Sequence, residues 1–468
     1  MGMGRRKEER QQELWIATDL LPQTPHHVFY EKLNKLLAQT GFDEFVEKLC
    51  QPYYAHNAGR DSIPPGVYFR MLFVGYFEGI DSQRGIAWRC ADSRSIARFL
   101  GYSEKEETPD HSSLTRIRDR LPEEVHDQVF PFVLQVAEEH KLLKGKTIAV
   151  DSTTLEANAA MKSIVRRDTG EDWREYVRRL AEEQGAPSET DEDLRRFDKN
   201  RPDKKVSNDE WVSDSDGESR ITKMKDGRTH LAYKAEHVID LESDFLLSAE
   251  VYHADEADTQ TLLPSVTAAQ ENLDQAGAAR DIEEVVADKG YHAADTLAQC
   301  NEWGVLGLRT YIPEPKRRSR WDWVRRPWEE RVAVSANHRR VRGQRSKRLQ
   351  RKRSELVERS FAHMCDTGGA RRTWLRGLEK IQKRYSIHAA ARNLGVVMRK
   401  LFGFGKPRTL QPEGGPVCLV QFAVSSVVAV LSAFRAEIRC LRRAAFEIRP
   451  VATTVERRPQ TMQSSTAC

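Results

Sequence analysis

The pattern of the sequence changes at Lys146, and no other feature restricts the possible folds as strongly. Before this point, apolar residues recur at intervals of three and four, as Phe29, Leu33 and Leu36 do, which is typical of amphipathic helices. At Lys146 the segment KTIAVDSTT begins, a short β-prone run that ends in an acid and several hydroxyls. We therefore expect an all-α N-terminal domain over residues 26–145, followed by a domain that contains a β-sheet.

Further β-prone runs follow in the second domain. Two of them, LAYKAEHVI and FLLSAEVYHA, are joined by a turn-rich segment at 240–244, which predicts a hairpin. A helical pattern covers 259–273, and two short runs come after it, one ending at Asp288 and the other near Thr310. The order strand, hairpin, helix, strand, strand predicts an α/β domain with a mixed sheet.

The remaining segments complete the expected domain organisation. We expect a tail over residues 1–25 and place the sheet-containing domain at 146–401. A charge-dense insertion at 161–219, rich in Pro, Ser and Asp, is predicted to lie outside the core and to carry one amphipathic helix near 173–180. Residues 402–468 form a C-terminal extension to which the sequence assigns no role.

Three acids are candidate ligands for a metal ion. Asp151 and Asp288 each end a predicted strand, and α/β proteins place their sites at the carboxyl edge of the sheet. Glu358 lies in the helical segment SELVERSF, and a helix crossing that edge would bring a third carboxylate. Hard oxygen donors suit Mg²⁺ or Mn²⁺, and two such ions support in-line phosphoryl transfer. Any one of the chain's 70 acids could equally be a surface residue.

The contexts of these acids resemble a known family. AVDSTTLEANA around Asp151, VVADKGYHA around Asp288 and LVERSFAHM around Glu358 resemble the DDE transposases of bacterial insertion sequences. GRDSIPP and TPDHSSLTRIRDRL are similar to the N-terminal helical domain of that family, and RRTWLRGLEKIQKRYSIHAAARNLG is similar to the insertion-sequence 1182 group. The resemblance spans residues 25–411 and implies an RNase H-like catalytic domain.

The resemblance also implies a function. Asp151, Asp288 and Glu358 would be the catalytic, metal-binding triad, holding two ions of Mg²⁺ or Mn²⁺. The chain would bind the terminal inverted repeats of its element and catalyse strand cleavage and transfer, as a homodimer on double-stranded DNA of transposon ends and target. Two alternatives stay open: an inactive relic that only binds DNA, and a nuclease without strand transfer. A related branch has Tyr, Arg and Lys around the Glu, where this chain has Arg351, Ser354 and Cys365.

Positive charge is concentrated before the predicted catalytic helix. The chain has a net charge of +5, yet Lys316–Arg353 alone holds sixteen bases and three acids. Such a run neutralises DNA phosphates, and Trp321, Trp323 and Trp328 could stack on unpaired bases. Solvated helix faces and core tryptophans are the alternative interpretation. The candidate DNA-binding residues are Arg116, Arg118, Arg339, Arg340, Arg342, Arg345, Lys347, Arg348, Arg371, Arg372 and Lys380.

Cysteine usage and the N-terminus favour a cytoplasmic protein, and the resemblance implies that it is nucleoid-associated. The seven cysteines are scattered without a CxxC pair, which signals neither a disulfide framework nor a zinc site. The start MGMGRRKEER lacks the apolar stretch of a signal peptide. Val417–Phe434 is uncharged, but polar residues dilute it, so we interpret it as a buried or partner-facing segment and expect no membrane association.

Overall fold

The computed structural model describes the chain from His27 to Pro407 with short internal gaps. The predicted N-terminal tail and the apolar segment Val417–Phe434 lie outside the described residues. Among the described residues, no helix combines the length and the apolar character that crossing a bilayer requires. The residues left out between the two ends are 56–61, 104, 203–205, 225–226, 305–306, 317–322 and 324–325.

The N-terminal region is all-α, as the apolar spacing predicted. Side-chain caps fix several helix starts: Asp110 accepts a hydrogen bond from the backbone N–H of Ser112 at 2.5 Å, and Ser82 from that of Gly85 at 3.0 Å. The central helix, α3, is buried around most of its circumference. The helices are α1 (Val28–Gln39), α2 (Phe42–Cys50), α3 (Pro65–Glu78), α4 (Gln83–Asp92), α5 (Arg94–Phe99), α6 (His111–Arg120), α7 (Glu123–Asp127) and α8 (Val129–Glu139), with a 3₁₀ turn, η2 (Gln51–Tyr53).

A mixed sheet follows, as expected. Its strand order is β4-β5-β1-β7-β8, and β6 also pairs with β5. β1 pairs antiparallel with β5 and parallel with β7, while β7 and β8 are parallel. The predicted hairpin is confirmed as the antiparallel pair β5–β6. The strands are β1 (Thr147–Glu156), β4 (Arg220–Lys223), β5 (Thr229–Asp240), β6 (Leu246–His253), β7 (Glu284–Val286) and β8 (Arg309–Tyr311).

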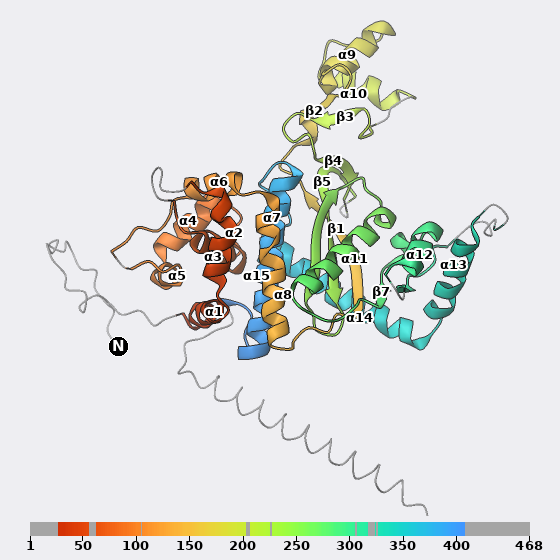
Figure 1. Ribbon diagram of the computed structural model, residues 1–468. Coiled ribbons are helices and arrows are strands. Elements are labelled where there is room, and N and C mark those ends of the chain that lie inside the picture. The colour runs from red at the N-terminus through yellow and green to blue at the C-terminus, as the bar shows by residue number, and fades with distance from the viewer. Residues whose placement is uncertain are drawn as a thin grey trace, which may run out of the picture. The chain divides into compact units, whose positions relative to one another are not determined.

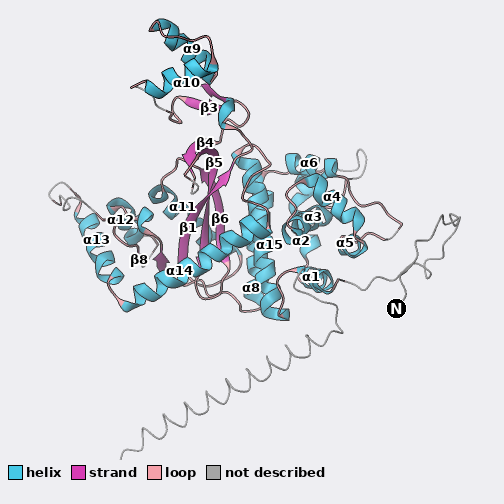
Figure 2. Ribbon diagram, turned by 180° about the vertical axis from the view of Figure 1, so that it is seen from behind, coloured by secondary structure: helices cyan, strands magenta, loops and turns pink. Residues whose placement is uncertain are grey.

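Helices cover both faces of this sheet. α11 (Asp258–Gln275) packs against β5 and β6 on one face. α14 (Gln344–Ala362) crosses the other face and contacts β1, β5 and β7, which Figures 1 and 2 show from opposite sides. The same arrangement places α14 over the strands that carry the candidate aspartates.

The last long helix joins the helical region to the sheet. α15 (Leu378–Phe402) packs against β6 and also against α3, α7 and α8. The apolar core is therefore continuous across both regions. The helical pattern that begins with SELVERSF is interrupted: α14 ends at Ala362, and a π-helical turn, η5 (His363–Thr367), and a loop precede α15. The other elements here are η4 (Lys289–Tyr291), α12 (Ala294–Glu302) and α13 (Trp328–Val341).

The charged insertion contains more structure than the sequence predicted. It holds two helices rather than one and a separate two-stranded sheet. Val177, Ala181 and Leu194 are fully buried there, so the segment builds a small core of its own. The charges that suggested an irregular segment instead form ion pairs, such as Arg166 with Asp168 at 2.7 Å. Its elements are η3 (Met161–Ser163), β2 (Ile164–Arg166), α9 (Trp173–Glu183), α10 (Asp191–Asn200) and β3 (Trp211–Ser213).

Candidate active site

The sheet brings Asp151 and Asp288 level with each other. The parallel register pairs Ala149 of β1 with Val286 of β7. Asp151 and Asp288 each lie two residues after this pair, so they are level with each other. The prediction that Asp151 ends its strand is wrong, because β1 continues to Glu156 while paired with β5. It is β7 that ends, just before Asp288, so Asp151 lies where the parallel pairing stops.

The local backbone holds both aspartate side chains. Oδ1 of Asp151 accepts the N–H of Ser152 at 2.9 Å, and Oδ1 of Asp288 accepts that of Gly290 at 2.7 Å. Burial raises the pKa of Asp151, and the nearby charge of Asp288 adds to this effect, while Arg353 opposes it. Among the described residues, the second carboxylate oxygen of each aspartate accepts no backbone hydrogen bond.

A third aspartate lies beside this pair. A Cβ on Gly290 would be 2.7 Å from Oδ2 of Asp258 and 3.0 Å from Oδ1 of Asp288, so a larger residue there would push the Asp258 carboxylate away. Asp258 is paired with Lys234 at 2.8 Å and accepts a hydrogen bond from Ser152 Oγ at 3.0 Å. Its charge is thus already balanced by a side chain of the sheet.

Arg353 reaches Asp151 from α14. Its Nη1 lies 2.6 Å from Oδ2 of Asp151, and its Nε donates to Gln350 Oε1 at 3.1 Å. Gln350 in turn donates to the backbone carbonyls of Ala287 and Tyr311, at 3.0 and 2.7 Å. Since Ala287 directly precedes Asp288, Gln350 and Arg353 tie α14 to both strands of the aspartate pair.

Glu358 lies on a different side of α14. It is five residues after Arg353, which is about 140° around a helix. Glu358 is exposed, and its Oε1 accepts a hydrogen bond from Ser354 Oγ at 2.8 Å. Within the described part of the chain, no three His, Cys, Asp or Glu residues are close enough together to hold a metal ion. The structure therefore brings the two aspartates together and leaves the glutamate apart from them.

Phe361 anchors the Glu358 side of α14 to the sheet. Its ring stacks on His237 of β5, with ring centroids 4.0 Å apart and an interplanar angle of 16°. Glu355, the other glutamate of this part of α14, is exposed and pairs with Arg359 at 3.2 Å.

The donor chemistry of the pair fits a hard divalent cation. Asp151 and Asp288 offer carboxylate oxygens from adjacent backbone positions. The Arg353 guanidinium, itself a cation, contacts Oδ2 of Asp151. Sequence reasoning missed Arg353 and Gln350. Gln350, Arg353 and Val357 follow one another at intervals of three and four residues, which marks the inner face of α14. The basic run hid this signal.

The candidate DNA-binding residues differ in whether they have partners within the protein. Two have internal roles: Arg340 donates to the backbone oxygen of Thr310 at 2.9 Å, and Arg345 pairs with the buried Glu284. Arg118 pairs with Asp119 at 3.2 Å and is mostly buried, and Arg371 and Lys380 have surface acids as partners. Six exposed basic residues lie in α13, in α14 and between them, and we call them the basic face: Arg339, Arg342, Lys347, Arg348, Arg351 and Lys352.

The other two candidates and the tryptophans are placed as follows. Arg116 is exposed on α6 and donates to Ser112 at 3.3 Å. Arg372 lies next to the end of β1 and covers the ring of Trp374 at 5.3 Å. Trp328 is 67% exposed, Trp323 packs against the core, and Trp321 lies outside the described residues.

Comparisons with known proteins assign the chain to a family. A family model described as "Transposase domain (DUF772)" matches residues 18–120, and one described as "Transposase DDE domain" matches residues 143–394. Searches of curated proteins and of solved structures gave no match. The DDE match contains Asp151, Asp288 and Glu358 and covers more than half of the 468 residues. The chain therefore belongs to the DDE transposase family.

Proposed function

We propose that this transposase cleaves DNA at the terminal inverted repeats of its element and joins the freed ends to target DNA. The observation that carries the proposal is the alignment of Asp151 with Asp288 at the end of the parallel pairing, beneath α14. Family membership supplies the reaction class, and the arrangement supplies adjacent carboxylates for phosphoryl transfer.

We assign the metal-binding role to Asp151, Asp288 and Glu358. Bound Mg²⁺ or Mn²⁺ ions would activate the attacking oxygen and stabilise the leaving one. Asp151 and Asp288 are aligned by their strands, whereas Glu358 has to leave Ser354 to join them. Arg353 neutralises Asp151 until then, and its release would give a positive side chain to a nearby DNA phosphate.

The topology supports an RNase H-like assignment for the catalytic domain. A three-stranded antiparallel unit, β6-β5-β1, continues into two short parallel strands, β7 and β8, with helices on both faces. We keep the domain limits at 26–145 and 146–401, and we keep the insertion-sequence 1182 group as the proposed relationship. A homodimer is proposed because two transposon ends have to be held together.

The basic face is the proposed DNA contact of the catalytic domain. Its side chains are exposed at the start of α14, on the helix whose other end carries Glu358. Guanidinium and ammonium groups there would neutralise phosphates without reading the base sequence. Recognition of the transposon ends is assigned to the helical region, where Arg116 is exposed.

An end-joining assay tests the proposal. The substrate is the DNA that flanks the gene, with its inverted repeats, incubated with the full chain, Mg²⁺ and a supercoiled target. Wild type should cut and join, whereas Asp151→Asn and Asp288→Asn should bind the ends and do neither. Cleavage without joining would indicate a nuclease, and binding without cleavage by wild type would indicate a relic. Mg²⁺-dependent cleavage by the Asp151→Asn variant would overturn the site assignment.

A further inference from the structure

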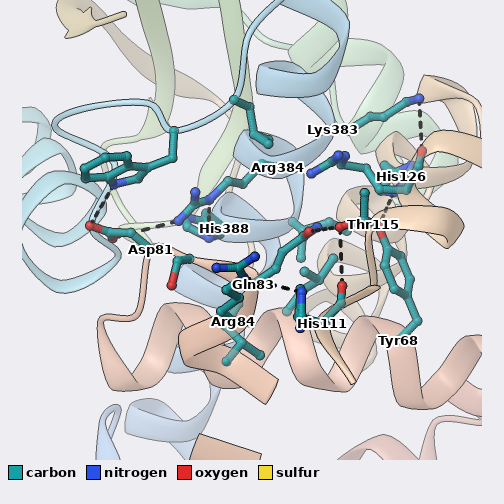
Figure 3. Close-up of a pocket in the computed structure, with 17 residues that line it drawn as sticks. Tyr68, Asp81, Gln83, Arg84, His111, Thr115, His126, Lys383, Arg384 and His388 are labelled. Carbon is teal, nitrogen blue, oxygen red and sulfur yellow. Dashed lines mark hydrogen bonds and ion pairs between the residues drawn. The ribbon is translucent and has the colours of Figure 1, made fainter. Parts of the chain in front are cut away.

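A cavity of about 300 Å³ lies between the helical region and α15, apart from the strands that carry the aspartate pair. Figure 3 shows Arg384 and His388 of α15 facing Gln83 and Arg84 of α4. The volume is at the lower end of the range for small-molecule sites, so it suits a single small ligand rather than a polymer.

The charged groups of this cavity are unbalanced. Arg84, Arg118, Lys383 and Arg384 line it, and Asp81 is the one acid among its lining residues. Asp81 Oδ1 is 3.8 Å from Arg384 Nη2, too far for a hydrogen bond. Burial lowers the pKa of Arg384 to about 10, which is the effect of a cation taken from water without adequate compensation.

Of the other three cations, Arg118 and Lys383 have acid partners outside the cavity, and Arg84 has none among the described residues. Arg118 pairs with Asp119 and Lys383 with Glu379, acids that do not line the cavity. Arg84 is exposed, donates to Nε2 of His111 at 3.4 Å and, within the part of the chain that the structure describes, has no carboxylate partner. An anion in the cavity would therefore meet two arginines that lack close counter-ions.

Buried polar atoms around the cavity also lack partners. They include two donors, Arg384 Nη2 and Nδ1 of His388, a residue that is 3% exposed, and one acceptor, Asp81 Oδ1, which an anion would not satisfy. Arg384 Nε donates to Nε2 of His388, so the ring proton is on Nδ1 as an unused donor. Buried donors are nearly always satisfied in folded proteins, and a site that a ligand completes is one explanation.

The lining also has an apolar and aromatic part, beside polar residues such as Gln83 and Thr115. Leu72, Ile86, Leu375 and Ile387 contribute aliphatic surface, and Trp374, 49% exposed, contributes an indole. The indole N–H donates to Asp81 Oδ2 at 3.3 Å, which holds the ring at the cavity. A ligand with an anionic end and a flat apolar end matches both parts of this lining.

We propose that the cavity binds one nucleotide, with its phosphate between Arg84 and Arg384 and its base against Trp374 and the aliphatic wall. The assignment of this nucleotide to an unpaired position of substrate DNA rests on the proposed function. A nucleotide held here would contact both α4 and α15, and so would tie DNA binding to the junction of the helical region and the catalytic domain.

Calorimetry on the full chain tests the proposal, with thymidine 5′-monophosphate as the probe. We expect saturable binding of the nucleotide, and much weaker binding of thymidine and of inorganic phosphate, each of which lacks half of the ligand. Arg84→Gln should weaken nucleotide binding about tenfold or more, because it removes a charge-assisted hydrogen bond. Lys35→Gln, which removes an exposed charge from α1 away from the cavity, should not.

A second pair of variants tests the aromatic wall. Trp374→Leu should weaken nucleotide binding several-fold, whereas Trp88→Leu, at a tryptophan that is 68% exposed and does not line the cavity, should leave it unchanged. Equal affinity in Arg84→Gln and Lys35→Gln, or no nucleotide binding at millimolar concentration, would overturn the proposal. Unchanged melting temperatures of the four variants would exclude unfolding as the cause of a loss.

The source of the nucleotide is tested by competition. A duplex with one unpaired 5′ nucleotide should displace the mononucleotide, while a blunt duplex should do so poorly. If neither duplex competes, the cavity takes a free nucleotide and its assignment to DNA is wrong. Asp151→Asn should retain nucleotide binding, so a failure of the proposed cleavage chemistry and a failure of this site give different results.

Discussion

The aspartate pair and Glu358 are held in place in different ways. Asp151 and Asp288 are aligned by the hydrogen bonds of parallel strands, and backbone N–H groups fix one oxygen of each. Glu358 is exposed on a helix, and Ser354 of the same helix is its hydrogen-bond partner. The sheet therefore fixes two of the proposed carboxylates, whereas Glu358 would join them only after a change at α14.

Arg353 stabilises the aspartate pair from α14. Asp151 and Asp288 repel each other, and the guanidinium at 2.6 Å from Asp151 reduces that repulsion. Gln350 fixes the helix in this position through two backbone carbonyls. The Arg353 guanidinium thus balances charge on Asp151 that a bound divalent cation would also balance.

The largest effect should come from the glutamates of α14. Glu358→Gln should lower Mg²⁺-dependent cleavage roughly 1,000-fold, because it removes one ligand's charge at the reacting phosphate. Glu355→Gln, which removes an acid paired with Arg359, should keep most of the activity. Rates on a nicked-end substrate measure both variants, and the opposite ranking would show that Glu355 completes the site.

Removal of the arginine should strengthen metal binding. Arg353→Gln takes away the cation that competes for Asp151, so we expect Mn²⁺ to bind about tenfold more tightly, which corresponds to about 1.4 kcal/mol. Arg359→Gln, on the same helix but paired with Glu355, is the control. Calorimetric titration of the DNA-free protein gives the affinities. Weaker Mn²⁺ binding in Arg353→Gln would mean that Arg353 supports the ion rather than replacing it.

Metal binding should also depend on pH. The pKa of Asp151 is raised by burial, so protons compete with the ion at pH values above the ordinary range of an aspartate. Affinity for Mn²⁺ should therefore rise as the pH rises through that raised pKa, by up to about tenfold per pH unit while the carboxyl is still protonated. A flat profile from pH 5 to pH 8 would contradict a role for this carboxyl.

The smallest expected effect concerns the basic face. Replacing Arg348, Arg351 and Lys352 with glutamine should weaken binding to all DNA sequences and reduce the slope of log affinity against log salt by about 0.9 per lost contact. Arg345→Gln should instead lower the melting temperature and leave the slope unchanged, because Arg345 pairs with the buried Glu284. An unchanged slope in the triple variant would show that the basic face does not touch DNA.

Much of the fold could be predicted because its signals are local. The hairpin follows from two alternating runs around a turn, and the helical region follows from apolar spacing. The insertion was harder to predict, because its core consists of a few residues, such as Val177 and Leu194, among many charges.

Deletion of the helical region would not be a clean test of its role, since α15 joins the core of that region to the core of the sheet.

The site was only partly predictable for a related reason. The motifs around Asp151 and Asp288 placed both at strand ends, but the length of β1 depends on its pairing with β5, which no local signal reveals. The face that a helix presents to a sheet depends on its whole inner stripe. Gln350 and Arg353 are polar members of the inner stripe of α14. Apolar spacing alone does not reveal polar residues on an inner face.

The central claim is that a divalent ion gathers Asp151, Asp288 and Glu358 into one site, and affinity cleavage by bound iron tests it most directly. Fe²⁺ replaces Mg²⁺ in the full chain on its DNA, and ascorbate and peroxide then produce radicals that cut the backbone near the ion. The account predicts cuts near residues 151, 288 and 358, all suppressed by excess Mg²⁺. Cuts near 151 and 288 with none near 358, in the presence of DNA, would contradict it.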